Sequence, residues 1–324
     1  MNLGVVILNW NGENLIKKFL PSVIKHTPVI HNIYLIDNGS TDDSVEFIRS
    51  NFNRVKIIKL DKNHGFAKGY NIGLKKIEDD ILCLLNNDVE VTENWTEKIL
   101  KQFVAEPNTV VIQPKMRDYY NKSNFDYAGA AGGFLDKYGY PYCNGRVYNK
   151  VEIDNNQYDK TREIFWACGA CFFVRNVVFK KYGGFDEIFW AHFEEIDLCW
   201  RLQNQGYKIS YNPYSIVYHA NAASLNQNHP RKTYLNYRNM LFTITKNSKN
   251  NLFFLLIEKL FVDITTAIYI LFDKGIMHFT AIIKAYLSFY KHINLLIKFR
   301  KNNKRDIKHY KIRSIICEYL FYKR

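Results

Sequence analysis

Three polar residues that follow an apolar run near residue 85 could together bind a divalent cation. Residues 82–85 form an unbroken apolar run, which favours a buried strand of a parallel sheet, and the run ends on Asn86, Asn87 and Asp88. Ligands of open α/β sheets bind at the carboxyl ends of such strands. Carboxylate and amide oxygens there suit a hard cation shared with the phosphates of a substrate. The alternative is that these residues form a simple polar turn.

Two adjacent carboxylates, Glu194 and Glu195, form a second candidate site for chemistry. Aromatic residues flank them, including Trp190 and Phe193, and no basic residue stands four positions after either one. Partial burial among aromatic rings raises the basicity of a carboxylate. The pair is therefore suited to take a proton from a hydroxyl group as a general base.

His219 is a candidate second metal ligand. A strand is predicted over residues 215–218, and His219 follows it directly, as Asp88 follows its own strand. Imidazole is a common metal ligand in proteins, although a histidine at a strand end can also be purely structural. The sequence leaves both interpretations open.

An α/β frame is predicted to position these residues. Four apolar strands alternate with three amphipathic helices within the first ninety residues, which specifies a Rossmann-like, doubly wound and mostly parallel sheet. The strands are predicted over residues 4–8, 33–36, 55–60 and 82–85. Because parallel strands end at the same edge of a sheet, the polar residues after the first, second and fourth strands should line one crevice.

That crevice suits a nucleotide. The residues expected to contact a nucleotide-sugar there are Asn9, Trp10, Asn11, Asp37, Lys68 and Asn87. Asp37 can accept a hydrogen bond from a base or a ribose, and Lys68 can reach a diphosphate. The glycines at 65, 69 and 73 recur every four residues, unlike a dinucleotide-binding fingerprint, and favour close packing of a helix on a strand.

The cysteines predict buried thiols and no metal site of their own. Only Cys168 and Cys171 among the six have a metal-like spacing, and they lie inside an apolar run. The first residues do not resemble a signal peptide. We therefore expect a cytoplasmic protein.

Positive charge is concentrated near the C-terminus. The chain carries a net charge of +14, and residues 273–324 hold thirteen Lys or Arg against three Asp or Glu, a net of +10. No nucleic-acid-binding module is recognisable, so we expect no nucleic-acid partner. The remaining anionic partner is a membrane surface, here the inner face of the cytoplasmic membrane.

Two helices predicted near the C-terminus are amphipathic. Residues 252–272 are long enough to span a bilayer, but their charged residues fall on one side of the helix. In the next helix Lys284, Lys291 and Lys298 recur every seven residues opposite an aromatic and aliphatic side. This pattern is typical of helices on an anionic membrane surface. The alternative is packing on the catalytic domain or on a second subunit, as in a homodimer.

Six polar motifs, taken in order, resemble glycosyltransferase family 2, and within it the rhamnosyltransferase-like branch of bacterial polysaccharide synthesis. The resemblance covers about residues 3–240. Its motifs are residues 5–12, residues 37–42, Asn63-x-Gly65-Phe66-Ala67, residues 85–88, residues 183–187 and Glu194-Glu195-x-Asp197-Leu198-x-x-Arg201.

The resemblance implies a GT-A fold and an inverting transfer from a nucleotide-diphosphate sugar with Mg²⁺ or Mn²⁺. Rhamnose is a candidate sugar, and a glycan or a lipid-linked glycan is the implied acceptor. By motif, Asp37 would contact the base, Asp88 the metal, and His219 the metal or the diphosphate. The catalytic base would come from Glu194 or Glu195. Glu195 stands where the family usually has Asp, so the choice between the two stays open.

We expect two parts in the chain. Residues 1–240 would form the GT-A catalytic domain, with a nucleotide-sugar half at 1–114 and an acceptor half at 115–240. Within the acceptor half, residues 115–163 lack periodicity and suggest long functional loops. A basic amphipathic helical extension would follow at 241–324. A catalytically weak nucleotide-sugar-binding protein on the same fold is the alternative function.

Overall fold

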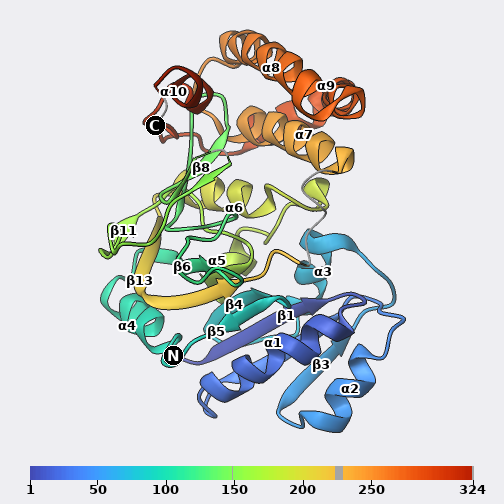
Figure 1. Ribbon diagram of the computed structural model, residues 1–324, viewed down its shortest axis with the longest axis vertical. Coiled ribbons are helices and arrows are strands. Elements are labelled where there is room, and N and C mark those ends of the chain that lie inside the picture. Colours follow the sequence, from blue (N-terminus) through green and yellow to red (C-terminus); the bar gives the residue numbers. More distant parts are fainter. Residues whose placement is uncertain (148, 223–228, 323–324) are drawn as a thin grey trace.

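A nine-stranded mixed sheet forms the centre of the computed structural model, which describes residues 1–147, 149–222 and 229–322 (Figure 1). The strand order is β11-β13-β6-β12-β4-β1-β2-β3, and β5 pairs with β13. The first four strands are β1 (Leu3–Asn9), β2 (Asn32–Asp37), β3 (Val55–Lys59) and β4 (Ile81–Asn86).

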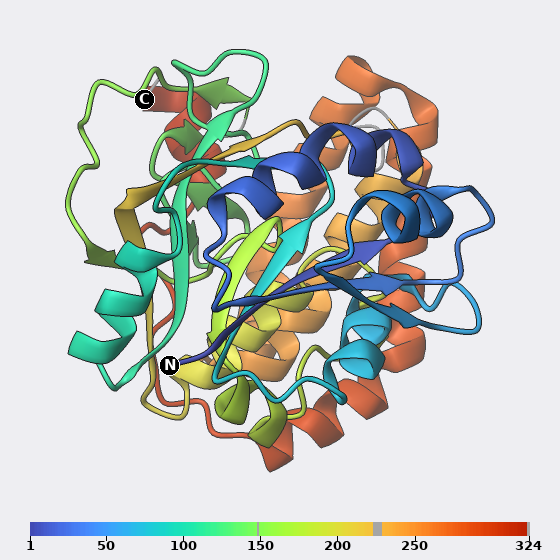
Figure 2. The ribbon, with the colours of Figure 1, turned by 90° about the horizontal axis from the view of Figure 1, so that it is seen from below.

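These four strands are parallel and alternate with α1 (Glu13–His26), α2 (Ser44–Asn51) and α3 (Gly65–Leu74). Figure 2 shows α1 and α2 in front of the sheet and the C-terminal helices behind it. Asn9 pairs with Asp37 and Leu8 with Asn86, so the polar strand ends share one edge. The predicted doubly wound, mostly parallel arrangement is confirmed.

Small residues let α3 lie close to the sheet. A Cβ added at Gly73 would lie 2.3 Å from Ile36 of β2, and one at Gly69 would lie 3.1 Å from Asn38. The predicted helix-to-strand packing role is confirmed for Gly73, whereas Gly69 adjoins the residue that follows β2.

The second half of the sheet brings distant segments beside β4. Here β12 (Cys171–Arg175) runs antiparallel between β4 and β6 (Thr109–Asp118), and β13 (Lys208–His219) runs parallel to β6. Short β5 (Val89–Val91) and β11 (Arg162–Glu163) pair antiparallel with β13. Cys168 and Cys171 are buried free thiols, as predicted.

Three helices pack on this half: α4 (Glu97–Ala105), α5 (Asn176–Lys181) and α6 (Glu194–Gln203), with a short 3₁₀ turn, η1 (Glu187–Phe189), before α6. The expectation of long loops over 115–163 was wrong in part. The segment contains the end of β6 and a four-stranded antiparallel sheet of β7 (Gly133–Leu135), β8 (Pro141–Cys143), β9 (Arg146–Val147) and β10 (Lys150–Val151). Strands of two or three residues are too short to show an alternating pattern.

Four helices lie at one end of the molecule: α7 (Pro230–Asn247), α8 (Leu252–Lys274), α9 (Ile276–Asn302) and α10 (Ile315–Tyr322). In Figure 1, α6 lies between the sheet and α7, and α8 and α9 lie beyond α7. The boundary expected near residue 240 falls inside α7. Arg300 of α9 donates to the carbonyls of Thr245 and Ser248 at 3.0 and 2.6 Å, which ties the end of α9 to the end of α7.

The two C-terminal helices α8 and α9 each bury one side against the protein, which was the alternative to a membrane surface. On the aromatic and aliphatic side expected for α9, Phe289 is buried, whereas Leu287 and Tyr290 are exposed. On α8 the polar side, with Lys259 and Asp263, is buried. Among the described residues, no helix combines the length and the apolar composition needed to cross a membrane.

Candidate active site

Pairing of β5 with β13 brings Asp88 and His219 together, as the sequence predicted. His219 lies opposite Val89, directly after Asp88. The Nε2 of His219 is 3.4 Å from Oδ1 of Asp88, and both side chains are buried. The other oxygen of Asp88 accepts a hydrogen bond from the backbone N–H of Ala222 at 2.7 Å.

Asp126 is a third member of this cluster that sequence reasoning missed. Its Oδ1 lies 3.1 Å from Nδ1 of His219 and accepts a hydrogen bond from Asn221 at 2.7 Å. Burial by itself lowers the pKa of His219, but the carboxylates of Asp126 and Asp88 raise it to about 10. Asp126 stands in the segment without periodicity, where no motif marks it.

The cluster fits a divalent cation. A carboxylate on Nδ1 orients a metal-binding histidine so that its Nε2 faces the ion, and Asp126 holds His219 in this way toward Asp88. Throughout the described ranges, no three His, Cys, Asp or Glu side chains are grouped so as to hold a metal ion. Asp88 and His219 would therefore supply two ligands, and further oxygen ligands would have to come from a substrate or water.

A side-chain hydrogen bond between Asn9 and Asn87 connects the ends of β1 and β4. The side-chain amide of Asn87 donates to Oδ1 of Asn9 at 2.9 Å, and Asn9 donates to Ser44 at 3.0 Å. A Cβ at Gly12 would lie 2.3 Å from Asn9, so the chain passes directly over this pair only with glycine there. Both amides are buried and engaged within the protein.

The loops after β1 and β2 are joined by short polar contacts. Asn11, in the loop after β1, accepts a hydrogen bond from the backbone N–H of Thr41, in the loop after β2, at 2.7 Å. Within the second loop, Asp37 accepts one from the backbone N–H of Ser40 at 3.0 Å. Trp10 lies in the loop after β1 and is 54% exposed. Trp10 and Asn11 thus lie where a ligand at this edge could reach them.

The start of α3 meets the segment that precedes the glutamate pair. Lys68 forms an ion pair with Glu187 at 3.5 Å, and the backbone N–H of Phe66 donates to the carbonyl of Trp190 at 3.0 Å. A Cβ at Gly65 would lie 2.9 Å from the Trp190 ring. The nucleotide-sugar half and the segment that carries the candidate base are therefore in direct contact.

Glu194 and Glu195 form the first turn of α6, after a strained turn. Trp190, His192 and Phe193 have φ angles of 61°, 67° and 72°, in the left-handed region that non-glycine residues rarely adopt. Burial raises the pKa of Glu195 to about 7, and burial together with the charge of Glu195 raises that of Glu194 well above its ordinary value. Among the described residues, Oε2 of each carboxyl has no hydrogen-bond partner.

Glu195 faces the connection that adjoins the end of β4. A Cβ at Gly169 would lie 3.9 Å from the carboxyl carbon of Glu195, and the next residue, Ala170, accepts a hydrogen bond from the N–H of Asn86 at 2.9 Å. Burial raises the pKa of the Cys168 thiol, and the charges of Asp126 and Glu195 raise it further. Gly169 and Ala170 therefore connect the surroundings of Glu195 with the end of β4, which Asp88 follows closely.

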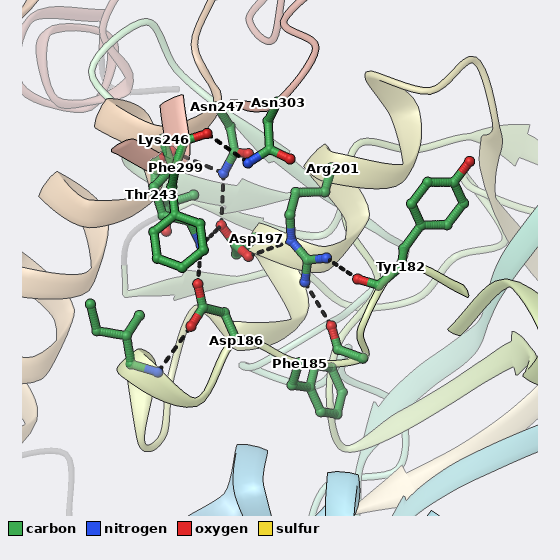
Figure 3. A network of polar contacts seen from close by, with 12 residues as sticks. Tyr182, Phe185, Asp186, Asp197, Arg201, Thr243, Lys246, Asn247, Phe299 and Asn303 are labelled. Atoms are coloured by element: carbon green, nitrogen blue, oxygen red, sulfur yellow. Dashed lines mark hydrogen bonds and ion pairs between the residues drawn. The ribbon is translucent and has the colours of Figure 1, made fainter. Parts of the chain in front are cut away.

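A buried ionic network fixes α6 and the turn before it (Figure 3). Lys246 of α7 is 2.6 Å from Asp186 and 2.8 Å from Asp197. Arg201 pairs with Asp197 at 2.8 Å, one helical turn earlier, and also donates to the carbonyl of Tyr182 at 2.8 Å. Lys246 was not predicted, because it lies far from its partners in the sequence.

A second contact from α7 holds the strained turn itself. The side-chain amide of Asn239 donates to the carbonyls of Phe189, Ala191 and His192 at 3.3, 2.9 and 2.7 Å. Asn239 is fully buried. The turn that carries the glutamate pair is thus held from α7, which no sequence pattern indicated.

Comparisons with known proteins identify the family of the chain. The family model described as Glycosyl transferase family 2 matches residues 4–183 of this chain. The N-acetylglucosaminyl-diphospho-decaprenol L-rhamnosyltransferase of Mycobacterium tuberculosis is 24% identical over 255 residues, which cover 72% of this chain and 83% of that protein.

Two solved structures share the fold. S. aureus TarS 1-349 in complex with UDP-GlcNAc has a TM-score of 0.58 and 16% identity, over 92% of this chain and 84% of that one. The mannosyltransferase PcManGT from Pyrobaculum calidifontis, in complex with GDP-Man and Mn²⁺, has a TM-score of 0.55 and 12% identity, over 99% of this chain and 88% of that one. The fold is GT-A. The family match spans more than half of the chain, and the protein belongs to glycosyltransferase family 2.

Proposed function

We propose that the protein is an inverting, metal-dependent transferase that moves a hexose or rhamnose from a nucleotide-diphosphate donor to a glycan or lipid-linked acceptor in cell-surface polysaccharide synthesis. One observation carries the proposal: Glu195, whose pKa is raised to about 7, lies beside Gly169, and the next residue is hydrogen-bonded to the end of β4, just before the Asp88–His219 pair. The mycobacterial relative, named for L-rhamnose and N-acetylglucosaminyl-diphospho-decaprenol, supports rhamnose and a lipid-linked acceptor.

Each cluster has its own part in the proposed reaction. Glu195 accepts the proton of the acceptor hydroxyl through Oε2, which has no other partner among the described residues. The acceptor oxygen forms a bond to the anomeric carbon while the bond to the diphosphate breaks on the opposite side, so the configuration inverts. A Mg²⁺ or Mn²⁺ ion bound by Asp88 and His219 would neutralise charge on the leaving diphosphate.

The donor would lie along the edge formed by β1, β2 and β4. Asp37 and Asn11 stand at the ends of the two loops expected to hold the nucleotide, and Trp10 offers an exposed ring beside them. Lys68 stands in the first turn of α3, where its ammonium can reach a diphosphate once it leaves Glu187. Asn9 and Asn87 act by holding the two strand ends in register.

The proposed location is the cytoplasmic side of the cytoplasmic membrane, with the chain bound peripherally. A nucleotide-sugar donor and a lipid-linked acceptor can meet there. The basic C-terminal segment, with a net charge of +10 over residues 273–324, supports attraction to anionic lipid.

The test is a transfer assay with a panel of nucleotide-sugars, a lipid-linked acceptor, and Mn²⁺ or a chelator. We expect Glu195→Gln to lower kcat by about 10²- to 10⁴-fold, the usual contribution of a positioned base, with donor affinity unchanged. Glu194→Gln should lower kcat less than Glu195→Gln does, and Glu195→Asp should keep measurable activity. Normal turnover of Glu195→Gln with loss in Glu194→Gln would reverse the assignment.

A catalytically weak binding protein is the second candidate. The single carboxylate of the metal motif and the Glu at the position of the usual Asp favour it. In that case calorimetry would detect nucleotide-sugar binding, while neither donor hydrolysis nor transfer would occur with any acceptor or cation.

A further inference from the structure

The outer side of α8 is apolar along its whole length. Phe253, Phe261 and Phe272 are 67%, 67% and 84% exposed. The other large apolar residues exposed on this helix are Phe254, Ile257, Leu260, Ile264, Ile268 and Tyr269. Contiguous apolar patches of this extent on a protein surface mark sites of interaction with a protein or a membrane.

The polar side of the same helix is directed inward and is satisfied there. Lys259 donates to Asp263 at 2.9 Å, and the other two contacts of Asp263 come from the hydroxyls of Tyr140 at 2.7 Å and Tyr286 at 2.6 Å. Tyr140 belongs to the small sheet and Tyr286 to α9. Rotating α8 to hide its apolar side would expose these hydroxyls and break a buried ion pair, which is strongly destabilising. The outward direction of the apolar side is therefore fixed by the core.

α9 follows α8 after a single residue, and its exposed side also holds apolar residues and adds charge. Ile276, Ile283, Leu287 and Tyr290 are 61%, 48%, 58% and 59% exposed. Lys284, Lys291 and Lys298 are exposed on the neighbouring positions of the helix. We name the exposed apolar residues of α8 and α9, together with these three lysines, the α8–α9 face.

Charge distinguishes between two partners that could cover the α8–α9 face, a second copy of the chain and a lipid bilayer. Exposed lysines recur along the α8–α9 face, whereas the exposed acidic residues between 252 and 302 are limited to Asp273. A second copy bound through the same face would bring lysines against lysines. A bilayer of anionic lipids instead offers acyl chains for the aromatic side chains and phosphates for the ammonium groups.

We propose that the α8–α9 face is a docking surface for an anionic bilayer, with the apolar side of α8 among the acyl chains and the lysines of α9 at the lipid phosphates. This deepens the proposed peripheral location and rests on it, but not on the transfer chemistry. In Figure 1 the helices α8 and α9 form the outermost layer, beyond α7 and remote from β3.

The experiment is sedimentation of the full chain with vesicles of phosphatidylcholine, with and without about one third phosphatidylglycerol, a composition chosen for charge contrast. The apolar variant is Phe253→Ser/Phe261→Ser/Phe272→Ser. Its matched control is Val29→Ser/Ile30→Ser, because these residues are 87% and 78% exposed in the loop between α1 and β2. The charge variant is Lys284→Glu/Lys291→Glu/Lys298→Glu.

We expect the wild type and the control to bind the anionic vesicles. The apolar variant should bind about tenfold or more weakly, since each phenyl ring loses its burial in lipid. The charge variant should lose the preference for anionic lipid, and salt should weaken binding of the wild type. Thermal unfolding of all variants, which change only exposed side chains, should match that of the wild type.

Other outcomes overturn the proposal. If the wild type does not bind vesicles and is a dimer in analytical ultracentrifugation, while the apolar variant is a monomer, the face binds a second copy. If all variants bind vesicles equally, the surface lies elsewhere. Transfer to a soluble acceptor, measured on the same proteins, separates the two claims: vesicle binding without transfer would contradict the proposed function and leave the docking surface standing.

Discussion

Replacing Lys246 by Met should test whether α7 supports the strained turn at residues 190–193 and the glutamate pair that follows it. The Nζ of Lys246 lies 2.6 Å from Asp186 and 2.8 Å from Asp197, and its side chain is 1% exposed. Methionine fills a similar volume without the charge, so Asp197 would remain buried with one cation fewer. Breaking a buried ion pair by removing one partner costs ~3–5 kcal/mol. We expect about 3 kcal/mol, the lower end of that range, because Arg201 still pairs with Asp197.

The pH dependence of this loss follows from Asp197. Burial by itself raises the pKa of Asp197, but Lys246 and Arg201 lower it below the ordinary value. A carboxyl with a lowered folded-state pKa stabilises the protein above the unfolded value, and this contribution disappears as the pH falls through the folded pKa. The deficit of Lys246→Met should therefore be constant near neutral pH and shrink only below the ordinary pKa of an Asp.

Urea unfolding at several pH values measures the loss, and the transfer assay measures its effect on turnover. Lys208→Met is the control, because Lys208 forms an exposed pair with Glu163 and its loss should barely move the urea midpoint. We expect Lys246→Met to lower kcat as well, since Asp197 lies in α6 with the glutamate pair and Asp186 precedes that helix. Equal urea midpoints for the two variants would refute the reasoning.

Three further predictions concern the chemistry. Asp88→Asn should abolish Mn²⁺-dependent donor binding in calorimetry while the protein still unfolds cooperatively; unchanged metal dependence would place the ion elsewhere. Asp126→Asn should weaken Mn²⁺ affinity by about 10- to 100-fold, the usual effect of losing the carboxylate that orients a metal-binding histidine, and normal affinity would contradict the role given to His219. The kcat/KM should rise with pH through about 7 as Glu195 loses its proton and level off above it; an acid limb retained in Glu195→Gln would assign it to another group.

Local patterns predicted the nucleotide-sugar half of the fold well. The alternation of short apolar strands with amphipathic helices indicated a parallel sheet, and the register of Asn9 with Asp37 follows from it. The same patterns gave no access to Asp126, Asn239 and Lys246, which act on residues 47 to 93 positions away. Such contacts depend on how elements pack, and no local periodicity encodes that.

The orientation of α8 shows a different limit of sequence reasoning. A helical pattern reveals that one side is polar, but the usual assumption that this side faces water failed here. Lys259 and Asp263 face inward because Tyr140 and Tyr286 supply hydroxyl partners from distant segments. The side that a helix buries is set by the partners available in the core.

The tie between α9 and α7 has a consequence for any attempt to divide the chain. Arg300 donates hydrogen bonds to the carbonyls at the end of α7. Asn239 and Lys246 of the same helix bind the segment that precedes the glutamate pair. A deletion that begins after residue 250 would remove the hydrogen-bond donor of those carbonyls and destabilise the end of α7. Lost vesicle binding in such a fragment would therefore come with lost turnover, and point substitutions on the outer surface are the way to separate anchoring from chemistry.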